Sequence, residues 1–125
     1  MSKTILIADD DSTIVKLFSL DAESRDTDVM IRSSGTGEET IAMLTRQKPD
    51  VLVLDIRMPR GDGFTVLEYL QEHKIDLPVI ILTNYNNDEY TKKVKNYGQV
   101  KEYMIKHEMR IDRIIDRVGS YLTAA

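Results

Sequence analysis

Short apolar runs alternate along this chain with longer segments in which apolar residues recur at helical spacing. The alternation predicts an α/β protein built from βαβ units around a mostly parallel sheet, because parallel strands need a connection long enough to hold a helix. The expected strands are residues 4–8, 29–33, 51–55, 78–83 and 101–105, and the expected helices are residues 12–24, 37–46, 64–73, 87–96 and 109–122.

Two of these strands, residues 51–55 and 78–83, are so uniformly apolar that both of their faces must be covered. They are therefore expected at the centre of the sheet. The first helix is expected to start after Asp11 and Ser12, which are common N-cap residues. Its inward stripe comprises Ile14, Val15, Phe18 and Ser19, and that of the last helix comprises Met109, Ile111, Ile114, Ile115, Val118 and Leu122.

Composition excludes several classes of function. The chain has 125 residues, enough apolar material for one core, and 17 basic against 21 acidic residues, a net charge of −4 that argues against direct nucleic-acid binding. It has no cysteine, and no apolar stretch is long enough to span a bilayer. Because Met1-Ser2-Lys3 runs straight into a strand, no signal peptide is expected. We therefore expect a cytoplasmic protein that binds neither nucleic acid nor membrane.

Acidic side chains follow two of the expected strands. Asp9, Asp10 and Asp11 follow the first, and Asp55 ends the third. The carboxyl ends of neighbouring parallel strands meet at one edge of a sheet, where open α/β sheets hold their ligands. Two like charges about 4 Å apart repel by about 4 kcal/mol at an effective dielectric near 20, so the cluster needs a cation. Carboxylates suit Mg²⁺, and Lys106 follows the last strand.

Five landmarks occur in order, each at or near a strand end. They are the pair Asp9-Asp10, the loop Asp55-Ile56-Arg57-Met58-Pro59-Arg60-Gly61-Asp62-Gly63, Thr83 after the fourth run, Lys106 after the fifth, and Tyr103 and Gly98 three and eight residues before that lysine. Together they resemble the receiver domain of bacterial two-component response regulators over essentially the whole chain. The resemblance implies a flavodoxin-like (βα)5 fold with strand order 2-1-3-4-5, and one domain covering residues 1–125.

The resemblance assigns the acidic residues to phosphoryl chemistry. It implies that Asp55 accepts a phosphoryl group from a phosphohistidine or a small phosphodonor, as a nucleophilic carboxylate. Asp9, Asp10, Asp55 and the backbone carbonyl of Arg57 are expected to hold Mg²⁺ or Mn²⁺. Asp11 is expected to act only at the helix start. The protein would take part in its own phosphorylation and dephosphorylation without being an enzyme for another substrate.

The remaining landmarks imply charge neutralisation and a switch. Lys106 and Thr83 are expected to contact phosphoryl oxygens, and Thr83 and Tyr103 to form the switch. The responding surface would be the fourth helix, the fifth strand and the last helix. Expected partners are a histidine kinase or histidine phosphotransfer protein and an output partner or effector domain.

A homodimer formed on activation is a further hypothesis. It would use Tyr90, Val94 and Tyr97 beside Lys92, Lys93 and Lys95, opposite Asp112 and Asp116. The alternative interpretation is that the tyrosines cover the sheet and the lysines solvate a helix.

The chain departs from the family pattern at three positions. His107 stands where the family usually has proline after the lysine, Asn84 where a small residue follows the threonine, and Gln99 where alanine follows the glycine. The proline often has a cis peptide bond, whereas a cis bond before histidine costs about 3 to 4 kcal/mol, so Lys106-His107 is expected to be trans. Arg57 and Tyr85 occupy positions that shape water access to the acyl phosphate in this family.

Three other functions fit the sequence less well. A receiver-like module that works without phosphate is the main alternative, favoured only by His107 and Asn84. A hydrolase of the haloacid dehalogenase type would need a second aspartate where this chain has Arg57. Neither Gly35-Thr36-Gly37 nor Gly61-Asp62-Gly63 has the third glycine of a dinucleotide-binding loop.

Overall fold

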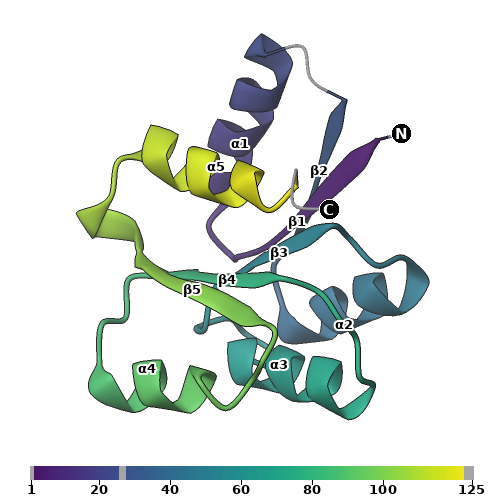
Figure 1. Ribbon diagram of the computed structural model, residues 1–125, viewed down its shortest axis with the longest axis vertical. Helices are drawn as coiled ribbons and strands as arrows, with labels where there is room; N and C mark the ends of the chain where they lie inside the picture. Colours follow the sequence, from purple (N-terminus) through teal and green to yellow (C-terminus); the bar gives the residue numbers. More distant parts are fainter. Residues whose placement is uncertain (1, 26–27, 123–125) are drawn as a thin grey trace.

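The computed structural model describes residues 2–25 and 28–122, which form one parallel five-stranded sheet with helices on both faces (Figure 1). The strand order is β2-β1-β3-β4-β5, so the expected α/β fold and topology are confirmed. The strands are β1 (Lys3–Ala8), β2 (Val29–Ser34), β3 (Val51–Leu54), β4 (Val79–Thr83) and β5 (Val100–Ile105).

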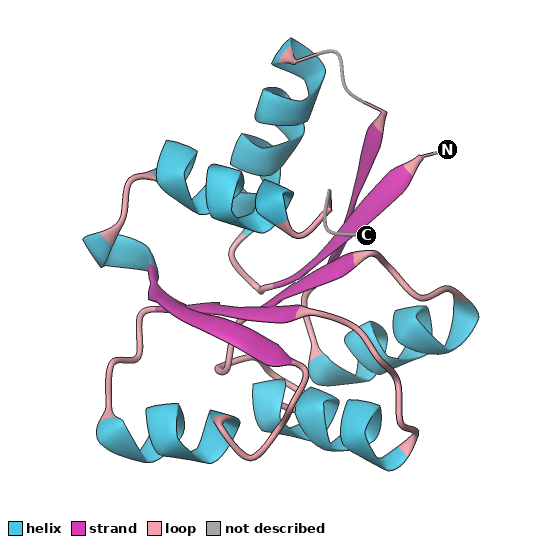
Figure 2. Ribbon diagram, viewed as in Figure 1, coloured by secondary structure: helices cyan, strands magenta, loops and turns pink. Residues whose placement is uncertain are grey.

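Helices α1 and α5 cover one face of the sheet, and α2, α3 and α4 cover the other (Figure 2). Within the described ranges, no helix combines the length and the apolar content needed to cross a bilayer. The helices are α1 (Ser12–Ser24), α2 (Gly37–Arg46), α3 (Gly63–Glu72), α4 (Asp88–Val94) and α5 (Ile111–Ser120), with a 3-10 turn, η1 (Lys106–Glu108), before α5.

The period-two alternation of the strands divides the core into two halves. In β1, Ile5 and Ile7 face α1 and α5, whereas Leu6 and Ala8 face the three helices on the other side. Strands β3 and β4 are buried at every position, which confirms that both lie inside the sheet. The core therefore fixes the register of these strands, because a shift by one residue would exchange the side chains of the two halves.

Four helices begin at a side-chain cap. Asp11, Thr36, Asp62 and Asn87 each accept a hydrogen bond from a backbone N–H in the first turn of the helix that follows. The expected start of α1 is thus confirmed, with Asp11 as its N-cap. The four caps come after β1, β2, β3 and β4, respectively, so each one ends a connection at the carboxyl edge of the sheet.

Several expected boundaries were wrong at the ends of elements. The last helix starts at Ile111 rather than at residue 109, because Lys106–Glu108 form η1 and Met109 is extended. Helix α4 ends at Val94, two residues earlier than expected. Strand β3 ends at Leu54, so Asp55 lies in the following connection.

Val94 and Tyr97, which the dimer hypothesis placed on the surface, are buried. Val94 is 2% exposed and Tyr97 is 7% exposed, and both belong to the core beneath the sheet. Tyr90 is half-buried and packs edge-on against the ring of Phe64, with the centroids 5.4 Å apart. Val94 and Tyr97 therefore cover the sheet, as the alternative interpretation held, whereas dimerisation on activation stays a prediction.

Backbone contacts attach the start of α2 to the β3–α3 connection. The N–H groups of Gly37 and Glu38 donate to the carbonyls of Pro59 and Arg60 at 3.3 and 2.9 Å. A Cβ at Gly37 would lie 2.0 Å from the carbonyl oxygen of Gly61, a residue whose φ of +93° also favours glycine. The loop that starts at Asp55 is therefore held by backbone that admits no side chain at Gly37.

We expect Gly37→Ala to lower the free energy of unfolding by about 2 to 3 kcal/mol, because the methyl group must displace the Gly61 backbone. Gly119→Ala is the matched control, because it is also a helical glycine and has open space around its Cβ position. It should be neutral or stabilising by up to about 1 kcal/mol. Urea unfolding measures both variants, and equal stability of the two would contradict the close contact.

Candidate functional site

The carboxyl ends of β1 and β3 bring three aspartates together. The two strands are neighbours, with Ala8 opposite Leu54, so Asp9 and Asp55 follow at the same edge of the sheet. One carboxylate oxygen from each of Asp9, Asp10 and Asp55 lies within 4.8 Å of the others. Asp10 is exposed, whereas Asp9 and Asp55 are buried. This arrangement is the acidic cluster predicted from the two strand ends.

Lys106 extends from the end of β5 into this cluster. Its Nζ lies 2.6 Å from Oδ2 of Asp9 and 3.0 Å from Oδ2 of Asp55. The three side chains are only 12%, 3% and 9% exposed, respectively. At this depth the ammonium offsets a repulsion between the carboxylates that solvent would screen poorly. The lysine is thus placed where the sequence predicted it, with a trans peptide bond to His107 as expected.

Burial changes the pKa of both partners in the Asp9–Lys106 pair. The pKa of Asp9 lies above its ordinary value because burial outweighs its hydrogen bonds with Lys106 and with the N–H of Asp11. Burial lowers the pKa of Lys106, but its hydrogen bonds to Asp9 and Asp55 outweigh that effect, so the net pKa is raised. Lys106 therefore stays a cation throughout the physiological range.

The connection after β3 orients the second carboxylate. Oδ1 of Asp55 accepts a hydrogen bond from the N–H of Arg57 at 3.3 Å, while its own N–H donates to the carbonyl of Ala8. Gly63 closes the loop by donating to the carbonyl of Ile56 at 2.8 Å. Asp55 is thereby fixed at both its backbone and its side chain. The metal-binding role expected for the Arg57 carbonyl stays a prediction.

The connection after β4 carries the remaining expected site residues. Thr83 is fully buried at the end of β4, and its Oγ1 accepts from the N–H of Tyr85. The Tyr103 hydroxyl donates to the carbonyl of Tyr85 at 2.5 Å. The guanidinium of Arg57 lies 4.4 Å from the centroid of the Tyr85 ring. Tyr103 on β5 and Arg57 on the β3–α3 connection thus both contact Tyr85. The sequence singled out Arg57 and Tyr85 separately, but it did not predict that they stack on each other.

A further contact that the sequence did not reveal joins two of the three departures from the family pattern, Asn84 and His107. Oδ1 of Asn84 lies 3.1 Å from the backbone nitrogen and 3.0 Å from the ring Nδ1 of His107. Each residue directly follows a site residue, Thr83 or Lys106. Their positions next to Thr83 and Lys106 were the one hint of this contact in the sequence. The contact itself forms because β4 and β5 are neighbours in the sheet.

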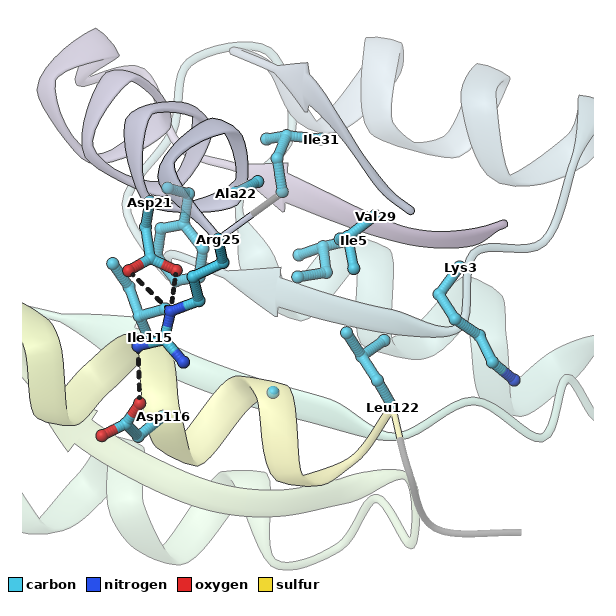
Figure 3. Close-up of a pocket in the computed structure, with 12 residues that line it drawn as sticks. Lys3, Ile5, Asp21, Ala22, Arg25, Val29, Ile31, Ile115, Asp116 and Leu122 are labelled. Atoms are coloured by element: carbon cyan, nitrogen blue, oxygen red, sulfur yellow. Dashed lines mark hydrogen bonds and ion pairs between the residues drawn. The ribbon is translucent and has the colours of Figure 1, made fainter. Parts of the chain in front are cut away.

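A groove of about 430 Å³ lies away from the acidic cluster, between α1, α5 and the starts of β1 and β2 (Figure 3). Arg25 lies at one side of it, where it pairs with both Asp21 and Asp116 at about 3 Å. The Asp116 carboxylate that the dimer hypothesis invoked is therefore already paired within the chain. The groove contains none of the acidic cluster.

Comparison with known proteins agrees with this geometry. Residues 5–118 match the family model of the response regulator receiver domain. The chain belongs to this family of two-component signalling proteins. It is 34% identical, over 106 residues, to the alkaline phosphatase synthesis transcriptional regulatory protein PhoP of Bacillus subtilis. The match covers 85% of this chain and 43% of PhoP. The receiver chain spans less than half of the curated relatives that it matches.

Solved receiver structures have the same fold. The Francisella response regulator 1452 receiver domain is 28% identical, with a TM-score of 0.81 and 97% of each chain covered. The beryllofluoride-activated DrrB receiver domain is 25% identical, also with a TM-score of 0.81, covering 99% of this receiver and all of that chain. The superposition extends over nearly every element described above.

We expect Lys106→Met to lower the free energy of unfolding by about 3 kcal/mol, because it leaves two buried carboxylates without their cation. Asp55→Asn should change it by less than about 1 kcal/mol, because the amide removes one of two like charges and its carbonyl oxygen can still accept a hydrogen bond from Lys106. Urea unfolding in the presence of a chelator tests this order.

Lys101→Met, which removes an exposed lysine from β5, is the control and should change stability by no more than about 0.5 kcal/mol. If Lys106→Met were as stable as the control, the ammonium would not hold the cluster together.

Proposed function

We propose that this receiver is switched by transfer of a phosphoryl group to Asp55. The observation that carries the proposal is the convergence of three carboxylates and one lysine at the carboxyl edge of the sheet. The phosphorus donor would be a phosphohistidine on a histidine kinase or phosphotransfer protein. One oxygen of Asp55 attacks phosphorus, the P–N bond breaks with its electron pair going to the imidazole, and an acyl phosphate forms.

The residues present fit a divalent cation. Receiver domains generally bind Mg²⁺ at an acidic pocket, and carboxylates on Asp9, Asp10 and Asp55 are the ligands such an ion prefers. The exposure of Asp10 leaves one side of the cluster open to the water molecules that Mg²⁺ usually retains. When bound, the ion would neutralise charge on the transferring phosphoryl group. Asp9, Asp10, Asp55 and the Arg57 carbonyl would hold it.

Lys106 would exchange one anion for another during transfer. Its ammonium now contacts Asp55 Oδ2, and the incoming phosphoryl oxygens would compete for the same positive charge. Phosphorylation takes the Asp55 group from a charge of about −1 to about −2, which favours contact with Lys106 and with a hydroxyl donor. Thr83 would be that donor, and the hydrogen bond that its Oγ1 accepts from the Tyr85 N–H, at 3.3 Å, is long enough to be given up easily. Movement of Thr83 would then release the contacts at Tyr85.

The proposed output follows from that connection. Tyr85 joins the site to Tyr103 on β5, so the surface of α4, β5 and α5 would respond. The relatives named as transcriptional regulators are about twice as long, so output would be carried by an effector domain or a separate partner. We place the receiver in the cytoplasm with its phosphodonor.

Phosphorylation at Asp55 is tested with acetyl phosphate and Mg²⁺, followed by intact mass. Wild-type protein should gain one phosphoryl group, and Asp55→Asn should gain none because the nucleophile is gone. Excess chelator should suppress the gain. Asp76→Asn, which alters an exposed aspartate before β4, is the control and should behave like wild type. Uptake by Asp55→Asn, or uptake that ignores chelator, would overturn the proposal, and the phosphate-independent module would replace it.

The switch is tested by amide shifts on adding beryllofluoride and Mg²⁺. Wild type should show shifts through α4, β5 and α5, whereas in Thr83→Ala they should stay within residues 55–63, because the hydroxyl contact is lost. Thr45→Ala, whose exposed hydroxyl lies on α2, is the control. Moving an equilibrium from 1:99 to 99:1 needs about 5.5 kcal/mol, which is more than one hydrogen bond supplies. Shifts in α4, β5 and α5 that are present but smaller in Thr83→Ala than in wild type would therefore also show that Thr83 contributes to the switch. Shifts that spread equally in Thr83→Ala would exclude Thr83 from the switch.

A further inference from the structure

The short turn η1 begins at Lys106 and lacks a cap of its own. Its N-cap residue, Ile105, makes no side-chain capping hydrogen bond. The first N–H groups of a helical turn have no partner within it, so they need an acceptor from elsewhere. Oδ1 of Asn84 supplies that acceptor across the sheet edge, 3.1 Å from the backbone nitrogen of His107. An amide side chain on the β4–α4 connection thus caps the turn that carries the site lysine.

The second contact fixes the tautomer of His107. Because the His107 backbone N–H can only donate, the Asn84 atom facing it must be the carbonyl oxygen and not the amide nitrogen. The ring Nδ1, 3.0 Å from that same oxygen, must then also donate and carry its proton. One oxygen therefore accepts two hydrogen bonds from His107, which matches its two lone pairs.

We propose that Asn84 and His107 form a clasp that positions Lys106, an inference that rests on the proposed function. Asn84 follows Thr83 and His107 follows Lys106, so the clasp joins the two connections one residue beyond the site side chains. It fixes the backbone from which the lysine reaches Asp9 and Asp55. Asn84 and His107 are positioning residues, since neither is among the residues that would contact the phosphoryl group.

The two contacts can be separated by substitution, because His107→Ala removes the ring contact and keeps the backbone one, whereas Asn84→Ala removes both. With acetyl phosphate and Mg²⁺, Asn84→Ala should slow phosphoryl uptake about fivefold, and His107→Ala about twofold, the sizes expected for ordinary hydrogen bonds. The double variant should be no slower than Asn84→Ala, whereas independent residues would give about tenfold. Asn86→Ala, on the same connection, and His73→Ala, at the carboxyl end of α3, are the controls.

A Lys106→Ala background shows whether the clasp acts through the lysine. There Asn84→Ala should change the rate by less than about twofold, since no ammonium remains to be positioned. An equal slowing with and without Lys106 would overturn the positioning role, as would an unchanged rate in Asn84→Ala when wild type is active. No uptake by wild type would instead overturn the proposed function, and the positioning role with it.

Long-range ¹H–¹⁵N correlation of the neutral His107 ring tests the contact without phosphoryl chemistry. Wild type should show the Nδ1–H tautomer, and Asn84→Ala should shift the ring towards Nε2–H, while His73 keeps its spectrum in both. A wild-type His107 that is mainly Nε2–H would overturn the clasp even if every phosphorylation result were as expected. Both side chains are exposed, so the variants should fold, and urea unfolding checks this.

Discussion

The ammonium of Lys106, held between Asp9 and Asp55, is the interaction on which the site depends. Lys106 follows β5 and Asp9 follows β1, with β4 and β3 between them in the sheet. Three strand spacings of about 4.8 Å must therefore be bridged at the carboxyl edge. A long side chain and connections that converge over the sheet achieve this, and Thr83 remains fully buried at the end of the intervening β4. One ammonium group thus connects the carboxyl ends of β1, β3 and β5, whose relative register the core sets.

The charge balance of the cluster explains why it suits a transient ligand. Three carboxylates and one ammonium leave a local charge of about −2, which a divalent cation neutralises. Before the cation binds, the raised pKa of Asp9 reflects how costly a buried carboxylate is even beside a lysine. The proposed phosphorylation would add one further negative charge, so the contacts of Lys106 and Thr83 would then have reason to change.

The sequence predicted most of the fold because the chain is locally consistent with it. Uniform apolar runs placed β3 and β4 inside the sheet, and side-chain caps such as Asp11 marked where helices begin. The strand order and residue roles came from the resemblance, since periodicity alone does not order strands. The ends of elements were harder to predict from the sequence. Nothing in the apolar spacing distinguishes a helix that starts at Met109 from a 3-10 turn that starts at Lys106. Contacts between connections, such as Gly37 against Gly61, depend on the tertiary arrangement and leave no local signal.

The connection after β4 is the part of the site that can move at least cost. Residues 84–87, which form this connection, are all exposed, so moving them disrupts little apolar packing, unlike the fully buried β4 before them. Yet Tyr85 on this connection contacts Arg57 from the β3 loop, Tyr103 from β5 and the hydroxyl of Thr83. All three contacts converge on this one residue, so a movement of Thr83 would disturb them together. If Asp55 is phosphorylated as proposed, a buried strand that ends in an exposed, multiply contacted segment would pass the change of charge at Asp55 to the surface at α4 and β5.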